Sequence, residues 1–401
     1  PPRAPPRHAG HPAHALEEEP ASVSVTICAW SAPGGQARQL RRCGIIAGVN
    51  RRIFLAATMG AVAAVLRASR GAPAEPDGRF DLAALQRGWR ARLRSVAATG
   101  KVPLIDIESS YNPGDFDVPG YARRMDRLGV AMIALSPEIG PGGFAQGRLW
   151  HDGARRLVQT DPERYIPTTT AGVYPAWTEK PKEFLDEHLR RAAEDGYPLL
   201  GEFEFRHYPS PRQVKRRETH RDVSIPITGE HGHRLFRFAE QTGVPFQIHY
   251  EIEDALLPPL EEMLAAYPRA KVIWCHLAQI RYQERSTIYG PAYLRRLLER
   301  HPGLHVDTAF GDAYSMYPVS GQRHARVWDD WGRVRPPWVE LIGDHPWRFL
   351  AALDLGPDRM NDLEDKVGAL RTFFAALPKP AHRVVAYGAA WKLLFGEQIE
   401  V

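Results

Sequence analysis

The sequence is poor in cysteine and has no long hydrophobic run. Its 401 residues include three cysteines, of which Cys28 and Cys43 lie near the start and Cys275 stands alone after them. A disulfide framework is therefore excluded for the main part of the chain. The apolar run at residues 53–66 is too short for a membrane span, which takes about 20 residues. No short-period repeat is present, which excludes a solenoid, and 44% hydrophobic content favours a globular, enzyme-sized protein.

Positive charge is concentrated in the first part of the chain. The formal net charge is +5, a value that could indicate an anionic partner. Residues 1–74 hold nine arginines against three glutamates, so residues 75–401 carry a net charge of −1. The composition of the main part therefore gives no reason to expect a nucleic-acid partner.

Residues 49–74 have the pattern of an export signal. An arginine pair, Arg51-Arg52, precedes the apolar run, and the small-residue segment 72–74 follows it. This pattern is similar to the bacterial twin-arginine signal, whose passengers cross the membrane already folded. We therefore expect a periplasmic or secreted protein with no stable membrane anchor after cleavage. The alternative is a buried N-terminal helix.

The leader divides the chain into three parts. We expect residues 1–48 to be either a disordered extension or sequence upstream of a true translation start near Val49. Residues 49–74 form the predicted twin-arginine-like signal peptide, and residues 75–401 form the predicted folded domain.

Apolar runs of strand length alternate with helical segments after the polar segment 75–100, in which no element is predicted. The predicted strands are residues 102–108, 130–135, 165–173, 198–205, 244–251, 271–276, 304–308 and 347–354. The predicted helices are residues 119–128, 154–161, 182–195, 230–241, 291–300 and 338–344, followed by C-terminal helices at 361–377 and 381–395. Eight strands that alternate with helices predict an α/β fold, a (β/α)8 TIM barrel with an N-terminal leader and C-terminal helices.

A long polar loop is predicted at residues 207–229. It contains the basic run Lys215-Arg216-Arg217 and a histidine, His220. Loops of this length in compact domains are usually functional or mobile. The loop is interpreted either as a solvated surface or as a lid that attracts an anionic substrate.

Acidic and imidazole side chains gather at the predicted strand ends. In a barrel of parallel strands the C-terminal ends open on one mouth, where catalytic residues lie. Imidazoles together with carboxylates suit a divalent metal such as zinc, which activates water at neutral pH. The candidates are Asp106, Glu108, Glu202, Glu204, His249, His276, Asp307 and Asp354.

Several short sequence segments resemble those of the amidohydrolase-2 branch of the amidohydrolase superfamily, which consists of metal-dependent TIM-barrel hydrolases and decarboxylases. They are Gly243-Val-Pro-Phe-Gln-Ile-His249, Val272-Ile-Trp-Cys-His276, Leu304-His-Val-Asp307-Thr and Pro346-Trp-Arg-Phe-Leu-Ala-Ala-Leu-Asp354. The resemblance implies that His249 is a metal ligand and that His276 binds the metal or polarises the substrate. It also implies that Asp354 holds the metal or acts as general base on water.

The first strand departs from the family pattern. Family members carry Asp-x-His-x-His there, whereas this chain has Asp106-Ile-Glu108-Ser-Ser110. One interpretation is a site for a divalent metal, zinc or manganese, rebuilt with carboxylates, in which Glu108 and Glu204 join His249 and Asp354. The added carboxylates favour a harder ion such as manganese or magnesium over zinc. The other interpretation is that the metal has been lost.

Three functional hypotheses follow. The first is a metal-dependent hydrolase that attacks a C–N or C–O bond of a small molecule, in which His276 polarises a carbonyl and Asp354 takes the proton from water. Its alternative is a decarboxylase or lactonase of the same superfamily. The second is a metal-free exported binding protein. The third is a metal-free acid–base enzyme that uses Glu108 and Asp354. The oligomeric state and the substrate are not predicted.

Overall fold

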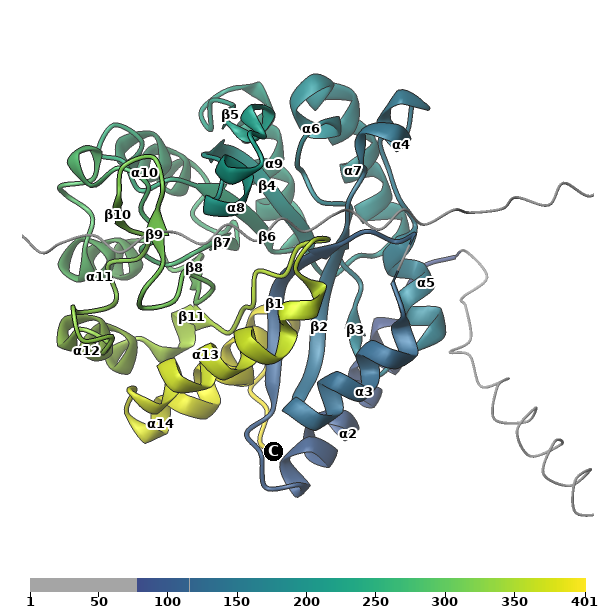
Figure 1. The fold of residues 1–401 in the computed structure, drawn as a ribbon. Helices are drawn as coiled ribbons and strands as arrows, with labels where there is room; N and C mark the ends of the chain where they lie inside the picture. The colour runs from purple at the N-terminus through teal and green to yellow at the C-terminus, as the bar shows by residue number, and fades with distance from the viewer. Residues whose placement is uncertain (1–77, 115) are drawn as a thin grey trace, which may run out of the picture. The chain divides into compact units, whose positions relative to one another are not determined.

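Eight parallel strands form the core of the computed structural model, which describes residues 78–114 and 116–401 (Figure 1). The hydrogen-bonded order is β1-β2-β3 in one sheet and β11-β8-β7-β6-β4 in the other, with β5 added antiparallel at the edge of β4. The barrel strands are β1 (Leu104–Tyr111), β2 (Val130–Pro137), β3 (Tyr165–Ile166), β4 (Leu200–His207), β6 (Phe246–Tyr250), β7 (Val272–Trp274), β8 (Leu304–Asp307) and β11 (Phe349–Leu350).

Backbone hydrogen bonds join these two sheets at both edges. On one side, the segment after β3 pairs with β4 through the parallel bridges at Thr168 and Gly172. On the other side, β1 and the β11 segment exchange bonds: Ile107 N donates to Ala351 O at 3.0 Å, and Asp354 N donates to Glu108 O at 3.1 Å. The ladder therefore closes into a (β/α)8 barrel, as the sequence predicts.

Gly172 shows why the closure needs a particular residue. Its N–H donates to Glu202 O at 2.6 Å, and a Cβ at this position would lie 2.6 Å from the ring of Phe203. Any larger side chain would push the segment after β3 away from β4.

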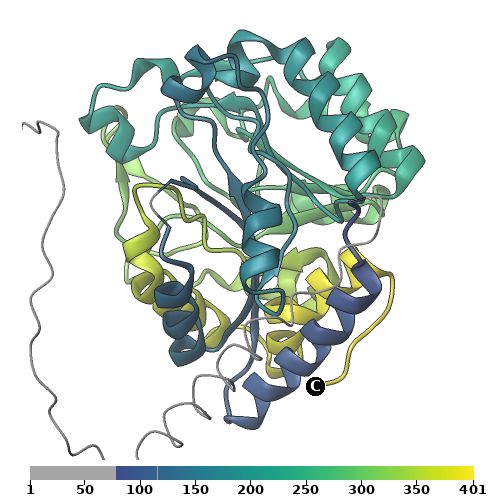
Figure 2. The ribbon, with the colours of Figure 1, turned by 90° about the vertical axis from the view of Figure 1, so that its right-hand side faces the viewer.

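Helices cover the outside of the strands (Figure 2). Their packed faces carry the apolar side chains, as in α7, where Phe184 and Leu185 are buried. The helices are α2 (Leu82–Ala98), α3 (Val118–Leu128), α4 (Pro141–Ala145), α5 (Gly153–Thr160), α6 (Ala176–Glu179), α7 (Pro181–Asp195), α8 (Pro211–Lys215), α9 (Glu230–Thr242), α10 (Leu257–Ala266), α11 (Pro291–Arg300), α12 (Pro336–Asp344), α13 (Leu363–Ala375), α14 (Lys379–Arg383) and α15 (Ala389–Phe395). Within the described residues, none of these helices is long and apolar enough to cross a membrane.

Short elements lie in the connections between the barrel strands. The predicted polar loop after β4 contains α8, a 3-10 turn η1 (Thr219–Arg221) and β5 (Val223–Ser224), so it is more ordered than the sequence indicates. A β9–β10 hairpin (Met316–Tyr317 and Gln322–Arg323) follows β8. Further short turns are η2 (Gln283–Arg285), η3 (Pro346–Arg348), η4 (Met360–Asp362) and the π-helical η5 (Val384–Gly388).

Helix α2 lies in residues 75–100, where no element is predicted from the sequence. Its buried residues Leu85, Trp89, Leu93 and Val96 recur at helical spacing, but the polar residues between them obscure the pattern. Trp89 packs on Phe395 of α15, with ring centroids 5.7 Å apart. The predicted leader, residues 49–74, and the segment 1–48 lie outside the described residues, so both predictions stay untested.

Candidate metal centre

A cavity of about 780 Å³ opens among the segments that follow the strand ends. Its lining includes Glu108, Glu202, Glu204, His249, His276 and Asp354, all of which are residues predicted from the sequence. Asp307 is fully buried beside Glu108 and His276, and Asp106 accepts hydrogen bonds from Ser109 Oγ, Leu353 N and Glu108 N. Most of the predicted strand-end residues therefore converge on one cavity.

Glu202, His249 and His276 form the tightest cluster. Glu202 Oε1 lies 3.2 Å from His249 Nδ1 and 3.2 Å from His276 Nε2, and the three donor atoms lie within 4.8 Å of one another. Burial would raise the pKa of Glu202, but the two imidazoles outweigh burial and lower this pKa to about 2. Burial would lower the pKa of His249, but Glu202 and Glu251 raise it to about 9. The surroundings therefore stabilise positive charge at this point.

The outer nitrogens of both imidazoles are held by buried acceptors. His249 Nε2 lies 3.4 Å from Glu251 Oε1, and His276 Nδ1 lies 3.1 Å from the carbonyl oxygen of Ala309. These contacts fix the ring orientations and direct His249 Nδ1 and His276 Nε2 toward Glu202. Carboxylate and carbonyl partners of this kind accompany metal-binding histidines.

Backbone strain coincides with two of the predicted residues. His276 has φ +67° and Asp354 has φ +48°, in the left-handed region that favours glycine. Strained residues of this kind persist where the surrounding structure over-determines them, and they cluster at functional sites.

A second cluster shares His276 and adds Glu108 and Asp307. Glu108 Oε2 and Asp307 Oδ2 are buried and have no hydrogen-bond partner in the part of the chain that the structure describes. Burial, together with the nearby carboxylates of Glu202 and Asp354, raises the pKa of Glu108 well above its usual range. Two unsatisfied buried carboxylate oxygens next to an imidazole would be stabilised by a cation.

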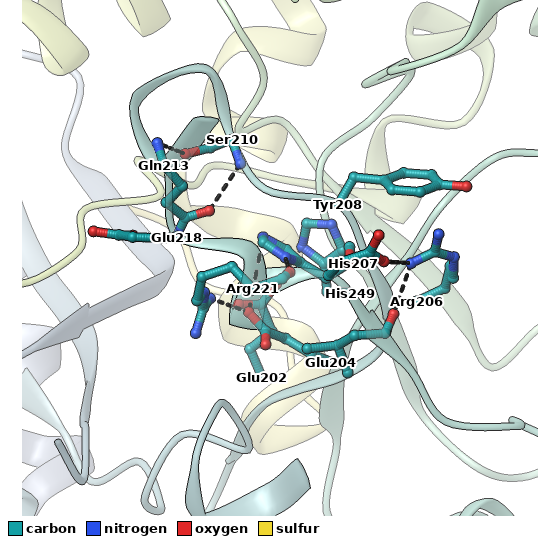
Figure 3. Close-up of polar contacts among 12 residues, drawn as sticks. Glu202, Glu204, Arg206, His207, Tyr208, Ser210, Gln213, Glu218, Arg221 and His249 are labelled. Atoms are coloured by element: carbon teal, nitrogen blue, oxygen red, sulfur yellow. Dashed lines mark hydrogen bonds and ion pairs between the residues drawn. The ribbon is translucent and has the colours of Figure 1, made fainter. Parts of the chain in front are cut away.

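Glu204 is engaged by an arginine rather than by the histidine cluster (Figure 3). Arg221, from the turn before β5, forms an ion pair with Glu204 Oε1, and His207 Nε2 lies 3.8 Å from the same oxygen. Burial raises the pKa of Glu204 to about 7 although Arg221 lowers it. The other oxygen, Glu204 Oε2, has no hydrogen-bond partner among the described residues.

Asp354 is likewise paired with cations. Arg359 donates to its two oxygens at 2.9 and 2.7 Å, and Lys366 Nζ lies 3.9 Å away. Burial would raise the pKa of Asp354, but these cations bring it well below its usual range. A carboxylate with so low a pKa is a weak base, so the proton-accepting role expected of Asp354 has no support in this arrangement and stays a prediction.

The two histidines predicted from the sequence lie in the clusters, whereas two of the carboxylates predicted to bind metal with them, Glu204 and Asp354, do not. The ligand set predicted from the sequence is Glu108, Glu204, His249 and Asp354. Among the described residues, two groups have ligand atoms close enough to share an ion: Glu202 with His249 and His276, and Glu108 with His276 and Asp307. Glu251 was missed as a partner of His249, although the spacing of two along a strand places both on one face. Arg221 and Arg359 come from loops, where no local pattern signals their approach.

Comparison with known proteins agrees with the family resemblance. Residues 163–345 match the amidohydrolase family. This stretch spans β3 to β8 and contains Glu202, His249 and His276. The match covers less than half of the 401 residues, so it shows that this stretch is similar to the amidohydrolase family, which includes hydrolases and decarboxylases. No curated protein matches the sequence.

Several solved structures resemble the fold at low identity. An uncharacterised TIM-barrel protein from Bordetella bronchiseptica is 12% identical with a TM-score of 0.46, covering 73% of this chain and 98% of its own. A 2,6-dihydroxybenzoate decarboxylase is 13% identical with a TM-score of 0.44, covering 73% and 99%. An amidohydrolase 2 from Bifidobacterium longum subsp. infantis is 13% identical with a TM-score of 0.37, covering 73% and 98%. Similarities this low do not assign an activity.

The donor atoms fit a divalent metal. Two imidazole nitrogens and one carboxylate oxygen form a set that zinc and manganese accept, and the unpartnered Glu108 Oε2 provides a further oxygen nearby. Ten carboxylates line the cavity against six arginine and lysine side chains. The excess of negative charge favours a bound cation.

Proposed function

We propose that the chain is a metal-dependent hydrolase that cleaves a C–N or C–O bond of a small molecule. The observation that carries the proposal is the convergence of Glu202 Oε1, His249 Nδ1 and His276 Nε2 inside the cavity. A divalent ion at this point supplies Lewis acidity and makes water a nucleophile at neutral pH. Decarboxylases and lactonases use similar centres, so product analysis has to distinguish them from a hydrolase.

The residues of the chain divide the remaining work among them. Glu202, His249 and His276 would hold the ion, with Glu108 beside them. Glu251 would keep the proton on His249 Nε2, which leaves Nδ1 free to bind the metal. Glu204 would take the proton from water, a role that is supported by the pairing of one of its oxygens with Arg221 while the other has no hydrogen-bond partner among the described residues. In this proposal the base is Glu204, whereas the sequence predicts Asp354.

Metal content tests this proposal. Protein purified without chelators should contain about one equivalent of zinc or manganese. His249→Ala and His276→Ala should each lose most of it, because each removes a nitrogen ligand. His220→Ala is the matched control, since His220 also lines the cavity but lies in neither cluster, and it should keep its metal.

The readout is elemental analysis of the four proteins, with circular dichroism to check folding. Unchanged metal content in both His249→Ala and His276→Ala would remove the histidine cluster from the site. A wild-type protein that holds no metal and takes up none when zinc or manganese is added would favour the metal-free binding protein.

A further inference from the structure

Arg281 is a buried arginine in the wall of the cavity, and it has no role in the proposed metal site. It lies five residues after His276, in the segment between β7 and α11, and its side chain is 2% exposed. Within residues 78–114 and 116–401, its Nε has no hydrogen-bond partner, and neither does the buried Oε1 of the neighbouring Gln279. Both residues line the cavity that contains the histidine cluster. Two unsatisfied buried polar groups in a cavity wall mark a place where a ligand can bind.

Arg281 differs from the other arginines of the cavity in its pairing. Among the described residues, the other four arginines that line it each donate to a carboxylate, in the pairs Arg212–Asp362, Arg216–Asp358, Arg221–Glu204 and Arg359–Asp354. Arg281 Nε lies 4.0 Å from Glu251 Oε1, beyond hydrogen-bond distance. Glu251 also faces His249, so its charge is shared between two groups.

The Arg281 guanidinium also contacts two side chains without negative charge, His324 and Tyr317. Its Nη1 lies 3.3 and 3.2 Å from the two ring nitrogens of His324, and its guanidinium carbon lies 5.5 Å from the centroid of the Tyr317 ring. Burial and the charge of Arg281 keep the pKa of His324 well below its usual value, so the ring is neutral. The β9–β10 hairpin segment therefore holds Arg281 in place without neutralising it.

We propose that Arg281, assisted by Gln279, binds a carboxylate of the substrate, so that the substrate is a small carboxylic acid. This rests on the proposed function, because it places the substrate's charged end beside the histidine cluster that acts on it. The guanidinium presents a planar set of N–H donors that fits a carboxylate, and the Gln279 amide can turn its NH2 group to the second oxygen. Because carboxylates outnumber cations in the cavity, a monoanion is favoured over a phosphate dianion.

Binding of benzoate to the full-length protein tests the inference. Titration calorimetry should detect saturable binding to the wild type and a loss of affinity of about tenfold or more in Arg281→Met. Arg281→Lys, which keeps the charge but not the planar fork, should bind with intermediate affinity and covers the case in which Arg281→Met does not fold. Arg285→Met is the matched control, since Arg285 lies in the same segment but is paired with Glu253 and does not line the cavity, and it should bind within about twofold of the wild type.

Four results would overturn the inference: equal benzoate affinity in wild type and both Arg281 variants, an equal loss in Arg285→Met, no saturable binding to the wild type, or tighter binding of inorganic phosphate than of benzoate. Metal content, measured on the same samples, separates this inference from the proposed function. Benzoate binding that depends on Arg281 in a protein without metal would support the subsite and count against the hydrolase. If the protein retains its metal and binds benzoate equally well with and without Arg281, the result would support the metal site and count against the subsite.

Discussion

Glu251 links the two halves of the site at the scale of single residues. Its Oε1 lies 3.4 Å from His249 Nε2 and 4.0 Å from Arg281 Nε. Burial would raise the pKa of Glu251, but Arg281 and His249 lower it, so the carboxylate is ionised. One buried anion therefore orients a metal-binding imidazole and holds the arginine that we assign to the substrate.

Replacing this anion should loosen the metal. Glu251→Gln keeps the shape of the side chain but removes the charge that stabilises the proton on His249 Nε2. We expect metal affinity to fall by about 10- to 100-fold, the usual effect of losing such a partner. Competition with a coloured chelator measures it, with Glu253→Gln, which contacts Tyr208 and Arg285 instead, as the control. Equal chelator competition by Glu251→Gln and wild type would show that Glu251 does not support the centre.

At the scale of elements, the segment between β4 and β5 covers part of the cavity. Helix α8 begins with a capping box in which Ser210 and Gln213 bind each other's backbone, so this segment is ordered locally (Figure 3). Arg212 and Arg216 connect it to Asp362 and Asp358, which follow β11. Ion pairs between exposed side chains contribute at most about 1 kcal/mol each, so this cover can open.

Removing both connections should make the cover more mobile. In Arg212→Ala/Arg216→Ala, amide hydrogen exchange in residues 208–222 should speed up by about three- to tenfold, because two weak pairs hold that segment closed. Exchange in β1 and β4 should not change. Arg296→Ala, on the surface of α11, is the control for loss of a surface arginine. Unaltered exchange across residues 208–222 in the double variant would show that the segment is held by other contacts.

Helix α7 carries a buried histidine that responds to pH. His188 is fully buried, its Nε2 lies 2.5 Å from Thr169 Oγ1, and burial lowers its pKa to about 3. The unfolded chain binds a proton at this residue below pH 6.5 and the folded chain does not. The stability contributed by neutral His188 is therefore complete above pH 6.5 and is lost as the pH falls toward 3.

His188→Gln should flatten this dependence. Between pH 6.5 and 4 the free energy of unfolding of the wild type should fall more steeply than that of the variant, by up to about 1.4 kcal/mol per pH unit. Urea denaturation at several pH values measures the two slopes. Parallel slopes would mean that His188 is protonated in the folded protein or does not titrate in this range.

At the scale of the whole molecule, the barrel was predictable because its strands are short apolar runs closed by glycines and polar residues. His249 and His276 were predictable for the same reason, since each ends such a run. Their partners were not, because Arg221, Arg281 and Arg359 approach from loops whose paths no periodic pattern encodes. Glu202 and Glu204 share one strand face in the sequence, and only the folded structure shows that one faces histidines and the other an arginine.

Anomalous diffraction from crystals of the purified protein tests the central claim most directly. Data collected on both sides of the zinc and manganese absorption edges should show one peak within about 2.0 to 2.3 Å of His249 Nδ1, His276 Nε2 and a Glu202 oxygen. The account is contradicted if crystals soaked in either metal show no peak in the barrel cavity, or a peak bound only by residues outside these three.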